Sequence, residues 1–264
     1  MPGEVIAVAN HKGGVGKSFT AVNLAAGLAQ GSWSTLIVDI DPQANSTEMF
    51  GTEEPDHDLF EVLARDLPVE KAIIGTGRPN LDLLPSRLWG AQLDKELMGQ
   101  YHREAQLRKS LSPVLERYDA IVMDLPPTLG QLVITSLAAA DSLIVPTDAS
   151  RWGRRGLAMF LEWSTDLRKA EVLTADLLGV LLTKYEPNTR ISRDVRQELI
   201  DTDQPLFETL IPKRTAAERM VGERQVLGDP GADDDLTEAY GHFTIEVMNR
   251  IRQRREERGG RHRG

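Results

Sequence analysis

Runs of apolar residues alternate with amphipathic stretches along the whole of this chain. Several of the apolar runs are continuous rather than alternating, and they are rich in leucine and β-branched residues. Such runs are typical of parallel strands that are buried on both faces of a sheet. We therefore predict strands at Val5–Asn10, Thr35–Asp41, Leu81–Pro85, Tyr118–Asp124, Ser142–Pro146, Leu177–Thr183 and Leu206–Ile211.

Helical periodicity fills the segments between these strands. One apolar stripe consists of Leu107, Leu111, Val114 and Leu115, and another consists of Leu236, Tyr240, Phe243, Val247 and Ile251. The alternation of strands and helices at this spacing predicts an α/β fold, with a doubly wound, mostly parallel sheet flanked by helices on both faces. Two loops are also expected. The segment Gly228–Asp235 is rich in turn residues, and the acidic segment Glu53–Asp58 is expected to be an exposed connection.

The charge is spread unevenly along the 264 residues. The net charge is −9, yet residues 249–264 contain seven arginines and two glutamates, a local net charge of +5. This asymmetry indicates an interaction tail, although a solvated, frayed terminus is the simpler alternative for the last few residues. We expect a single domain over residues 1–257 and a basic, disordered tail at residues 258–264.

The chain contains no cysteine, which excludes disulfides, thiolate metal sites and cysteine nucleophiles. The first residues have no basic segment of the kind that begins a signal peptide. The most apolar stretch, residues 132–146, is short and interrupted by Asp141, so no membrane-spanning helix is expected. We therefore expect a cytoplasmic protein.

The first predicted strand leads into a glycine-rich segment, Asn10–Ser18, which an amphipathic helix follows. This order places backbone N–H groups and a helix N-terminus around a phosphate. In such a loop Lys17 reaches the phosphates and the hydroxyl of Ser18 ligates Mg²⁺. The regular pattern would have glycine where this chain has His11, and a second lysine, Lys12, stands at the start of the loop. A glycine turn with two incidental lysines is the alternative, and the strand and helix on either side disfavour it.

The run from Lys12 to Ser18 resembles the deviant Walker A motif of the ParA/MinD superfamily of P-loop ATPases, and the resemblance extends from Glu4 to about Ile251. It implies ATP and Mg²⁺ as cofactors. It also implies a homodimer that encloses two ATP molecules, in which Lys12 contacts the phosphates bound to the other subunit. The nucleotide-binding residues that it implies are Lys12, Gly13, Gly14, Val15, Gly16, Lys17, Ser18, Phe19, Lys184, Pro212 and Lys213.

Two predicted strands end in carboxylates, at the edge of an open α/β sheet where ligands bind. The run Asp39–Gln43 resembles the switch I segment of the superfamily, and Asp124 closes an apolar strand as in a Walker B motif. Strand-end capping is the alternative for Asp39 and Asp41. By resemblance Asp41 positions the attacking water, and Asp39 supports the magnesium shell or the loop. The implied catalytic residues are Lys12, Lys17 and Asp41, and the implied metal-holding residues are Ser18, Asp41 and Asp124.

Two later segments and one departure complete the resemblance. The segment Leu182–Lys184 corresponds to a contact on the adenine side, and Leu210–Arg214 corresponds to a segment that flanks the base. Position 19 is phenylalanine where many relatives carry a hydroxyl residue near the α-phosphate, and Thr20 is a candidate to replace that hydroxyl.

The branch of the superfamily follows from what the chain lacks. Without cysteine, it does not match the nitrogenase-iron-protein relatives or the arsenite-pump ATPases. After Ile251 the chain has no Leu, Ile, Val, Phe or Trp, so it does not provide the apolar face of a membrane-docking helix of the MinD type. No terminal tyrosine cluster marks a kinase of the superfamily. The partition branch, ParA/Soj, therefore fits best.

That branch implies an ATP-hydrolysing DNA-partition protein with a slow basal rate, associated with the nucleoid. Its ATP dimer binds DNA without sequence preference and is released by a ParB-type partner. The candidate DNA contacts are Arg190, Arg193, Arg196, Arg214 and Arg219. Three alternatives remain open: a solvated face in place of a DNA contact, a MinD-like or gradient-forming regulator of cell division, and a small-molecule ligase related to dethiobiotin synthetase.

Overall fold

The structure, a computed structural model, describes residues 3–52, 54–88 and 103–261. Eight strands within these ranges form one sheet in the order β3-β4-β2-β5-β1-β6-β7-β8. Neighbouring strands are parallel, except that β3 and β4 are antiparallel. The strands are β1 (Glu4–Val8), β2 (Thr35–Asp39), β3 (Ile74–Gly75), β4 (Leu81–Leu84), β5 (Ala120–Asp124), β6 (Ser142–Asp148), β7 (Asp176–Tyr185) and β8 (Leu206–Pro212). The predicted α/β fold with a doubly wound, mostly parallel sheet is confirmed.

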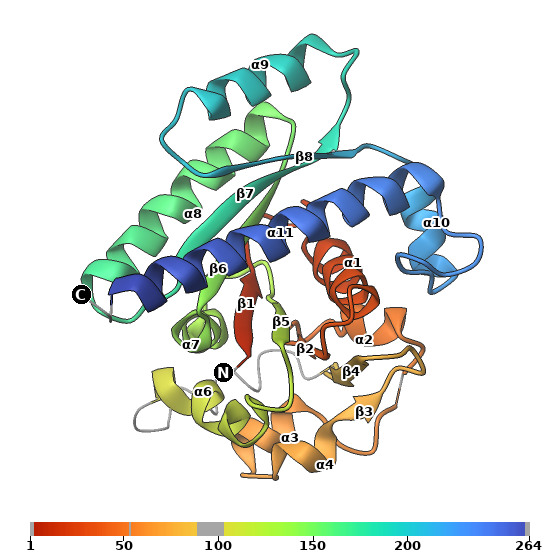
Figure 1. Ribbon diagram of the computed structural model, residues 1–264, viewed down its shortest axis with the longest axis vertical. Coiled ribbons are helices and arrows are strands. Elements are labelled where there is room, and N and C mark those ends of the chain that lie inside the picture. Colours follow the sequence, from red (N-terminus) through yellow and green to blue (C-terminus); the bar gives the residue numbers. More distant parts are fainter. Residues whose placement is uncertain (1–2, 53, 89–102, 262–264) are drawn as a thin grey trace.

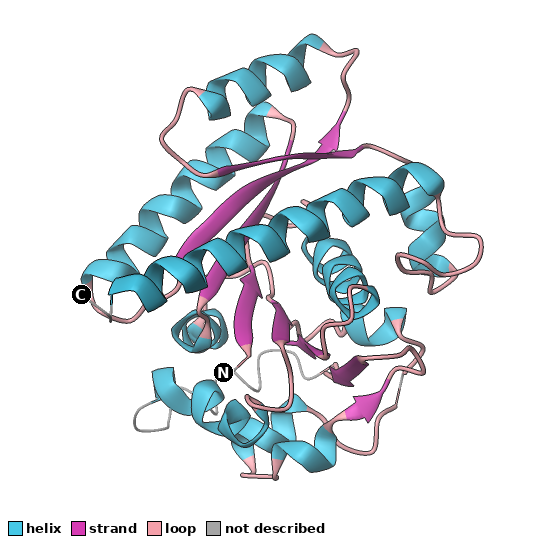
Figure 2. Ribbon diagram, viewed as in Figure 1, coloured by secondary structure: helices cyan, strands magenta, loops and turns pink. Residues whose placement is uncertain are grey.

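Helices cover both faces of the sheet (Figure 1; Figure 2). The helices are α1 (Lys17–Gln30), α2 (Asn45–Met49), α3 (Leu59–Ala64), α4 (Val69–Ala72), α6 (Gln106–Leu111), α7 (Gln131–Ala139), α8 (Arg151–Lys169), α9 (Arg190–Ile200), α10 (Ala216–Gly222) and α11 (Asp234–Arg261). Two short 3-10 helices, η1 (Arg103–Ala105) and η2 (Ser112–Val114), flank α6. Helix α11 runs across the molecule beside β8 and α1 (Figure 1).

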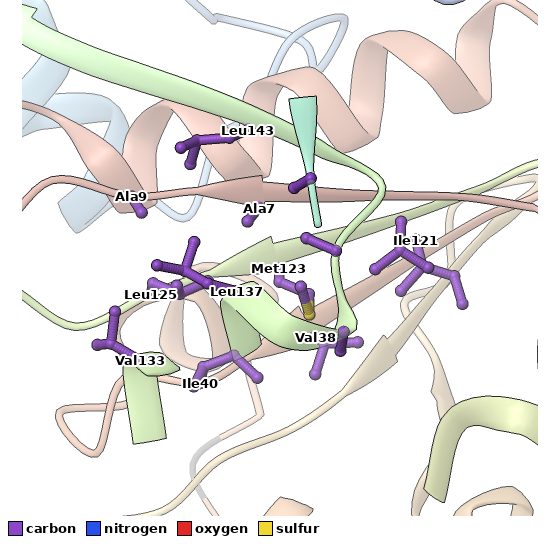
Figure 3. Packing of buried hydrophobic residues seen from close by; sticks show 14 of the residues in the cluster. Ala7, Ala9, Val38, Ile40, Ile121, Met123, Leu125, Val133, Leu137 and Leu143 are labelled. Atoms are coloured by element: carbon purple, nitrogen blue, oxygen red, sulfur yellow. The ribbon is translucent and has the colours of Figure 1, made fainter. Parts of the chain in front are cut away.

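Successive residues of the central strands enter two separate apolar clusters. In β1, Ala7 packs among residues of α3, α6, α7 and α8, whereas Ile6 and Val8 pack among residues of α1 and α11. Figure 3 shows the first cluster, in which Ala7, Val38 and Met123 of three adjacent strands meet Leu137 of α7. The continuous apolar runs of the sequence thus reflect a sheet with no solvent-exposed face at its centre.

The strand order reverses around β1, because the chain adds β2 and β4 on one side of it and β6, β7 and β8 on the other. Ligands in open α/β sheets bind outside the carboxyl ends of the strands at such a reversal. The last residue of β5, Asp124, lies opposite both Val8 of β1 and Asp39 of β2. The carboxylates that the sequence placed at strand ends therefore meet at the point where the phosphate loop leaves β1.

One predicted helix differs from the structure, and one short strand was not predicted. The helix expected over the stripe from Leu107 to Leu115 ends at Leu111 and continues as the 3-10 helix η2. Pro113 explains the change, because proline lacks the N–H of a regular helical turn and its ring collides with the carbonyl four residues earlier. Strand β3, only two residues long, was not predicted from the sequence.

Two expected surface segments also differ. Asp58 was expected on an exposed connection, but it is fully buried and its carboxylate accepts a hydrogen bond from the N–H of Glu61 at the start of α3. Residue 53 of that segment lies outside the described residues. Helix α11 continues to Arg261, so residues 258–261 of the expected disordered tail are helical, and residues 262–264 lie outside the description.

Candidate functional site

The glycine-rich loop connects β1 to α1 and leaves an open space above its backbone. Gly14 and Gly16 have φ values of 73° and 86°, a region that residues with a Cβ rarely adopt. A Cβ built on Gly13, Gly14 or Gly16 would meet no atom within 4 Å. Gly16 is also the N-cap of α1, so the N–H groups of the first helical turn border this space. The loop is therefore a preformed cradle for an anion such as a phosphate.

Lys17, the first residue of α1, is only 6% exposed. Its Nζ donates a hydrogen bond to the carbonyl oxygen of Lys12, 3.3 Å away. Burial lowers the pKa of Lys17, and the carboxylates of Asp124 and Asp41 oppose that shift. The ammonium thus lies inside the loop, close to both carboxylates, where an anionic ligand would be neutralised.

Asp39 holds the segment that follows β2. Its Oδ1 accepts a hydrogen bond from the N–H of Asp41 at 3.1 Å, and its Oδ2 accepts from the N–H and the hydroxyl of Thr47, each at 2.7 Å. Burial, followed by the adjacent Asp124, raises the pKa of Asp39 well above its usual value. Of the two roles expected for Asp39, these contacts agree with support of the loop.

Asp41 lies at the turn into α2 and is 5% exposed. Its Oδ1 accepts a hydrogen bond from the N–H of Gln43 at 3.0 Å, and its carbonyl oxygen accepts from the N–H of Ala44 at 2.8 Å. The first bond holds one carboxylate oxygen, and the second closes the turn. Asp41 therefore stands in a hydrogen-bonded turn, close enough to Lys17 to oppose the lowering of its pKa.

Asp124 is fully buried at the end of β5. Its Oδ2 accepts a hydrogen bond from Ser46 Oγ at 2.7 Å, and Ser18 also donates a hydrogen bond to it. Burial raises the pKa of Asp124 to about 6, against the opposing effect of these two hydroxyls. Sequence reasoning missed Ser46 and Thr47. Their only signal is that two hydroxyl residues follow the switch I run.

The residues at this edge suit a magnesium ion. Asp124 Oδ1 is buried and has no hydrogen-bond partner, so one carboxylate oxygen is left for a further ligand. Within the described ranges, no group of three or more His, Asp or Glu side chains could hold a metal ion alone. Mg²⁺ usually keeps several waters and binds through one or two protein oxygens plus phosphates. Ser18 and Asp124 provide that small donor set next to the phosphate cradle.

A cavity of about 330 Å³ adjoins the loop on the side of β8. It is lined by Gly14, Gly16, Phe19, Thr183, Lys184, Ile211, Pro212, Lys213, Arg214, Thr215, Ala217, Glu218, Val221, Leu236 and Tyr240. The loop thus opens onto a partly apolar space of the size that small ligands and cofactors occupy. Lys184, Pro212 and Lys213, which belong to the two segments that the resemblance places beside the base, contribute to its wall, and so does Phe19, which the resemblance places near the α-phosphate.

Helix α11 contributes to this cavity in a way that the sequence did not predict. Tyr240 is buried, its ring meets that of Phe19 edge-on at 5.5 Å between centroids, and its hydroxyl lies 3.1 Å from Thr20 Oγ1. Thr20 is itself fully buried. Its hydroxyl is therefore engaged with Tyr240 and is not free to replace the hydroxyl that residue 19 lacks.

The end of β7 is tied to the phosphate loop. Thr183 Oγ1 donates a hydrogen bond to the carbonyl oxygen of Val15 at 2.9 Å, and Lys184 Nζ donates to that of Gly14 at 2.6 Å. Lys184 has a φ of 51°, an unusual value for a residue with a side chain. These contacts explain how a segment about 170 residues away in the sequence becomes part of the same site.

The five candidate DNA-contacting arginines do not form one cluster. Arg190, Arg193 and Arg196 are on α9. Arg219 is in α10 and Arg214 lies just before that helix, on a separate part of the molecule (Figure 1). Three of the five have acidic partners: Arg190 lies 3.5 Å from Asp194, Arg219 lies 3.2 Å from Glu223, and Arg214 pairs with Asp235. Arg193 and Arg196 share one flank of α9, as their spacing predicted.

Similarity to known proteins agrees with this geometry. A family model described as an AAA domain matches residues 3–177. The sporulation initiation inhibitor protein Soj of Bacillus subtilis (strain 168) is 36% identical over 235 residues, which cover 86% of this chain and 92% of Soj. The chromosome partitioning protein ParA of Myxococcus xanthus (strain DK1622) is 37% identical over 218 residues, covering 80% of this chain and 76% of that protein.

The fold also matches a solved structure. Cobyrinic acid a,c-diamide synthase from Mycobacterium smegmatis, crystallised with bound ADP and magnesium, has a TM-score of 0.82 and 28% sequence identity. The match covers 95% of this chain and 96% of that protein. The glycine cradle, the strand-end carboxylates and the relatives lead to the same assignment, and the chain belongs to the ParA/MinD family of P-loop ATPases.

Proposed function

We propose that this chain is a DNA-partition ATPase whose ATP-bound homodimer binds DNA without sequence preference and is released when a ParB-type partner stimulates hydrolysis. One observation carries the proposal. A phosphate cradle with an inner lysine, Lys17, has a second lysine, Lys12, at its start, in a chain whose relatives include a chromosome partitioning protein. A second cation at the rim ties assembly to the charge of the nucleotide, because ATP offers more negative charge than ADP.

In this proposal the nucleotide occupies the cradle and the adjoining cavity. The backbone of Gly13, Gly14, Val15 and Gly16 surrounds the phosphates, and Lys17 neutralises them from within the loop. The base enters the cavity beside Phe19, Lys184, Pro212 and Lys213. The apolar part of that wall accepts a ring, and the lysines and backbone groups at its rim favour the sugar and phosphates.

Hydrolysis requires a positioned water and a stabilised phosphate charge. Ser18 and Asp124 would hold Mg²⁺, and the bound ion would supply positive charge next to the phosphates. Asp41 lies at the same edge in a hydrogen-bonded turn and orients the attacking water. Lys12 and Lys17 stabilise the negative charge that develops on the transferred group. The basal rate is slow, because the ATP state serves as a timer for DNA binding.

The DNA contact is proposed on the basic residues of α9 and α10. A local cluster can bind phosphates although the whole chain is acidic, because screening limits interactions between exposed charges to about 10 Å at moderate ionic strength. Arg193 and Arg196 lie together on one flank of α9, and a dimer would present that flank twice. Single copies therefore bind weakly, and the ATP dimer binds more firmly.

The test is co-sedimentation with plasmid DNA and, separately, with anionic liposomes, each with ATP, with ADP and without nucleotide. The expected result is retention on DNA with ATP only, falling steeply as salt rises. Retention on liposomes instead of DNA would favour the MinD-like regulator. No helix among the described residues has the length and apolar character needed to span a membrane.

A further inference from the structure

The first turn of α1 offers few hydroxyl groups to a ligand in the phosphate cradle. Ser18 has one, but residue 19 is phenylalanine, and Thr20 is fully buried with its hydroxyl 3.1 Å from that of Tyr240. Phe19 is only partly buried, and it lines the cavity beside the loop. Where the cradle opens into the cavity, a ligand therefore meets an aromatic side chain in place of a hydrogen-bond donor.

The ring of Phe19 is held by a series of edge-on aromatic contacts. It meets Tyr240 of α11 at 5.5 Å between centroids, with an interplanar angle of 71°. Tyr240 meets Phe243 at 6.3 Å and 78°, and Phe243 meets Phe207 of β8 at 4.9 Å and 79°. The last three side chains are buried, so the series runs from the cavity into the core. Edge-on pairs are a favoured arrangement of aromatic rings, so they restrict the orientation of Phe19 before a ligand binds.

The backbone of Phe19 is held as well. Asn23 is buried one turn later, and its Nδ2 donates a hydrogen bond to the carbonyl oxygen of Phe19 at 2.7 Å. The Oδ1 of Asn23 accepts from the N–H of Leu227 at 2.8 Å, in the segment after α10. Phe19 is therefore fixed from α1, from α11 and from that segment. A ligand that packs against such a preorganised side chain loses little affinity to its ordering.

The rest of the cavity wall favours packing over hydrogen bonding. Four of its polar side chains already have partners within the protein, namely Thr183, Lys184, Lys213 and Arg214. The apolar side chains of Ile211 and Pro212 belong to the same wall as Phe19. A flat heteroaromatic ring gains stacking and apolar contacts in a space of this kind. The nucleoside is therefore the part of a nucleotide that fits this wall.

We propose that Phe19 is a specificity-determining residue whose ring packs against the nucleoside, and that Tyr240 is the positioning residue that holds this ring in place. The inference rests on the proposed placement of the nucleotide, with its phosphates in the cradle and its base in the cavity. A hydroxyl at position 19 would stabilise the phosphates of any bound nucleotide, whereas an aromatic ring stabilises only the nucleoside. This chain thus derives more of its nucleotide affinity from the nucleoside than a chain with a hydroxyl at that position.

The first experiment compares ADP with pyrophosphate, which has two phosphates but no nucleoside. Neither ligand requires hydrolysis or an ATP dimer. Equilibrium dialysis with radiolabelled ADP gives the Kd of ADP, and displacement of the label gives the Kd of pyrophosphate, for wild type and for Phe19→Leu. Loss of an aromatic partner of a base weakens binding about 5- to 150-fold. We expect a rise of that size in the Kd of ADP for Phe19→Leu and an unchanged Kd of pyrophosphate.

The second experiment tests how Tyr240 acts. Tyr240→Leu removes the ring that meets Phe19 and should raise the Kd of ADP, whereas Tyr240→Phe keeps a ring there and should restore the wild-type value. In the Phe19→Leu background, Tyr240→Leu should cause no further rise, because Tyr240 acts through Phe19. Tyr118→Leu is the matched control. Tyr118 is also buried and donates to one carboxylate, that of Asp82 at 2.8 Å, but it lies outside the cavity wall, so the Kd of ADP should not change.

The outcomes separate the inference from the proposed function. An equal rise for ADP and pyrophosphate in Phe19→Leu, or an unchanged Kd of ADP, overturns the inference and leaves DNA partition standing. Pyrophosphate that fails to displace ADP from the wild type contradicts the placement of the phosphates in the cradle, and a wild type that binds neither ligand overturns both proposals. Additive rises in the double variant would refute the role of Tyr240. Circular dichroism checks the fold of each variant, and the Phe19→Leu comparison decides alone where Tyr240→Leu does not fold.

Discussion

Charged side chains at the carboxyl ends of the strands lie in a different environment from those at the amino ends. At the carboxyl ends of the strands, Asp39 and Asp124 are neighbours in the register of β2 and β5, and both are fully buried. Burial raises the pKa of both carboxyls, and one oxygen of Asp124 has no hydrogen-bond partner. This edge carries unfavourable electrostatics that a cation could relieve.

At the amino ends of β1, β6 and β7, the first residues are Glu4, Ser142 and Asp176. The last turns of α11 satisfy all three. Arg254 donates to Asp176 Oδ2 at 2.5 Å and to Ser142 Oγ at 2.8 Å, and Arg255 lies 3.4 Å from Glu4 Oε2. The charged groups at the amino ends hold α11 against the sheet. At the carboxyl ends, by contrast, one oxygen of Asp124 is left without a hydrogen-bond partner. The difference is typical of a functional site compared with a structural contact.

The largest effect is expected for Lys12→Ala. Loss of the second loop lysine should abolish ATP-dependent dimerisation, because the proposed dimer relies on this charge at the phosphates of the other subunit. The free energy of unfolding should change by less than about 1 kcal/mol, since only its partly exposed ion pair with Asp148 is lost. Light scattering with ATP tests the first expectation, and chemical denaturation tests the second. An unchanged ATP-induced dimer would reject the proposed role.

Asp41→Ala should lower the rate of ATP hydrolysis about 10²- to 10⁴-fold, the range for loss of a group that positions or activates the attacking water. Dimerisation with ATP should persist, so the variant should remain on DNA in the ATP state. A phosphate-release assay and DNA co-sedimentation measure the two effects. Normal turnover would sink the water-positioning role of Asp41.

Asp124→Asn should stabilise the nucleotide-free protein at pH 7 by about 1 to 3 kcal/mol, because it removes a buried charge. The pKa of Asp124 is raised to about 6, so the folded state holds a proton that the unfolded state releases near pH 4. The contribution of Asp124 to the free energy of unfolding of the wild type is therefore fully present below pH 4, and it is lost as the pH rises through about 6. The advantage of the variant should shrink as the pH falls through that window.

The measurement is urea denaturation of both proteins from pH 4 to pH 7 without Mg²⁺ or nucleotide. A variant that is less stable than wild type at pH 7 would contradict the view that this edge carries unfavourable charge. The same variant should lose ATP hydrolysis. A single substitution would then raise the stability of the fold and remove its activity.

The smallest effect is expected at the opposite edge. Arg254→Ala should destabilise the fold by about 1 kcal/mol, because a partly buried side chain with two partners is lost. Arg252→Ala is the matched control, since Arg252 is exposed on the same helix and should cost less than about 0.5 kcal/mol. ATP hydrolysis should be unchanged in both. Equal destabilisation by the two variants would show that the contacts of Arg254 do not anchor α11.

Much of the fold was predictable because its signals are local. Buried parallel strands are apolar at successive positions, so all seven predicted strands were found with shifts of only a few residues at their ends. The seven-residue glycine-rich motif likewise needs only its own strand and helix. The errors in the secondary structure had two causes, a proline within a helical pattern and an element too short to show one. Pro113 divided a predicted helix, and the two-residue strand β3 was too short to leave any pattern.

The arginines show where sequence reasoning stops. Spacing alone placed Arg193 and Arg196 on one face of a helix, but it did not show that Arg214 is paired with Asp235. The excess of arginine over residues 249–264 indicated an interaction tail, of which only residues 258–264 were expected to lie outside the domain. Three arginines of the part assigned to the domain, Arg250, Arg254 and Arg255, contact carboxylates or carbonyl groups of the fold, and Arg250 also lies over the ring of Phe207.

The sequence by itself determined the chemistry of the site: glycines where the backbone must turn, lysines beside them, and carboxylates at strand ends. Each of these features spans only a few residues, so it can be recognised from the sequence without the structure. Only the tertiary structure decided which charges are satisfied. Lys12 and Asp148 are 136 residues apart, and Thr20 and Tyr240 are 220 residues apart. The physical reason is that an ion pair or hydrogen bond depends on distances of about 3 Å, which folding alone establishes between distant segments.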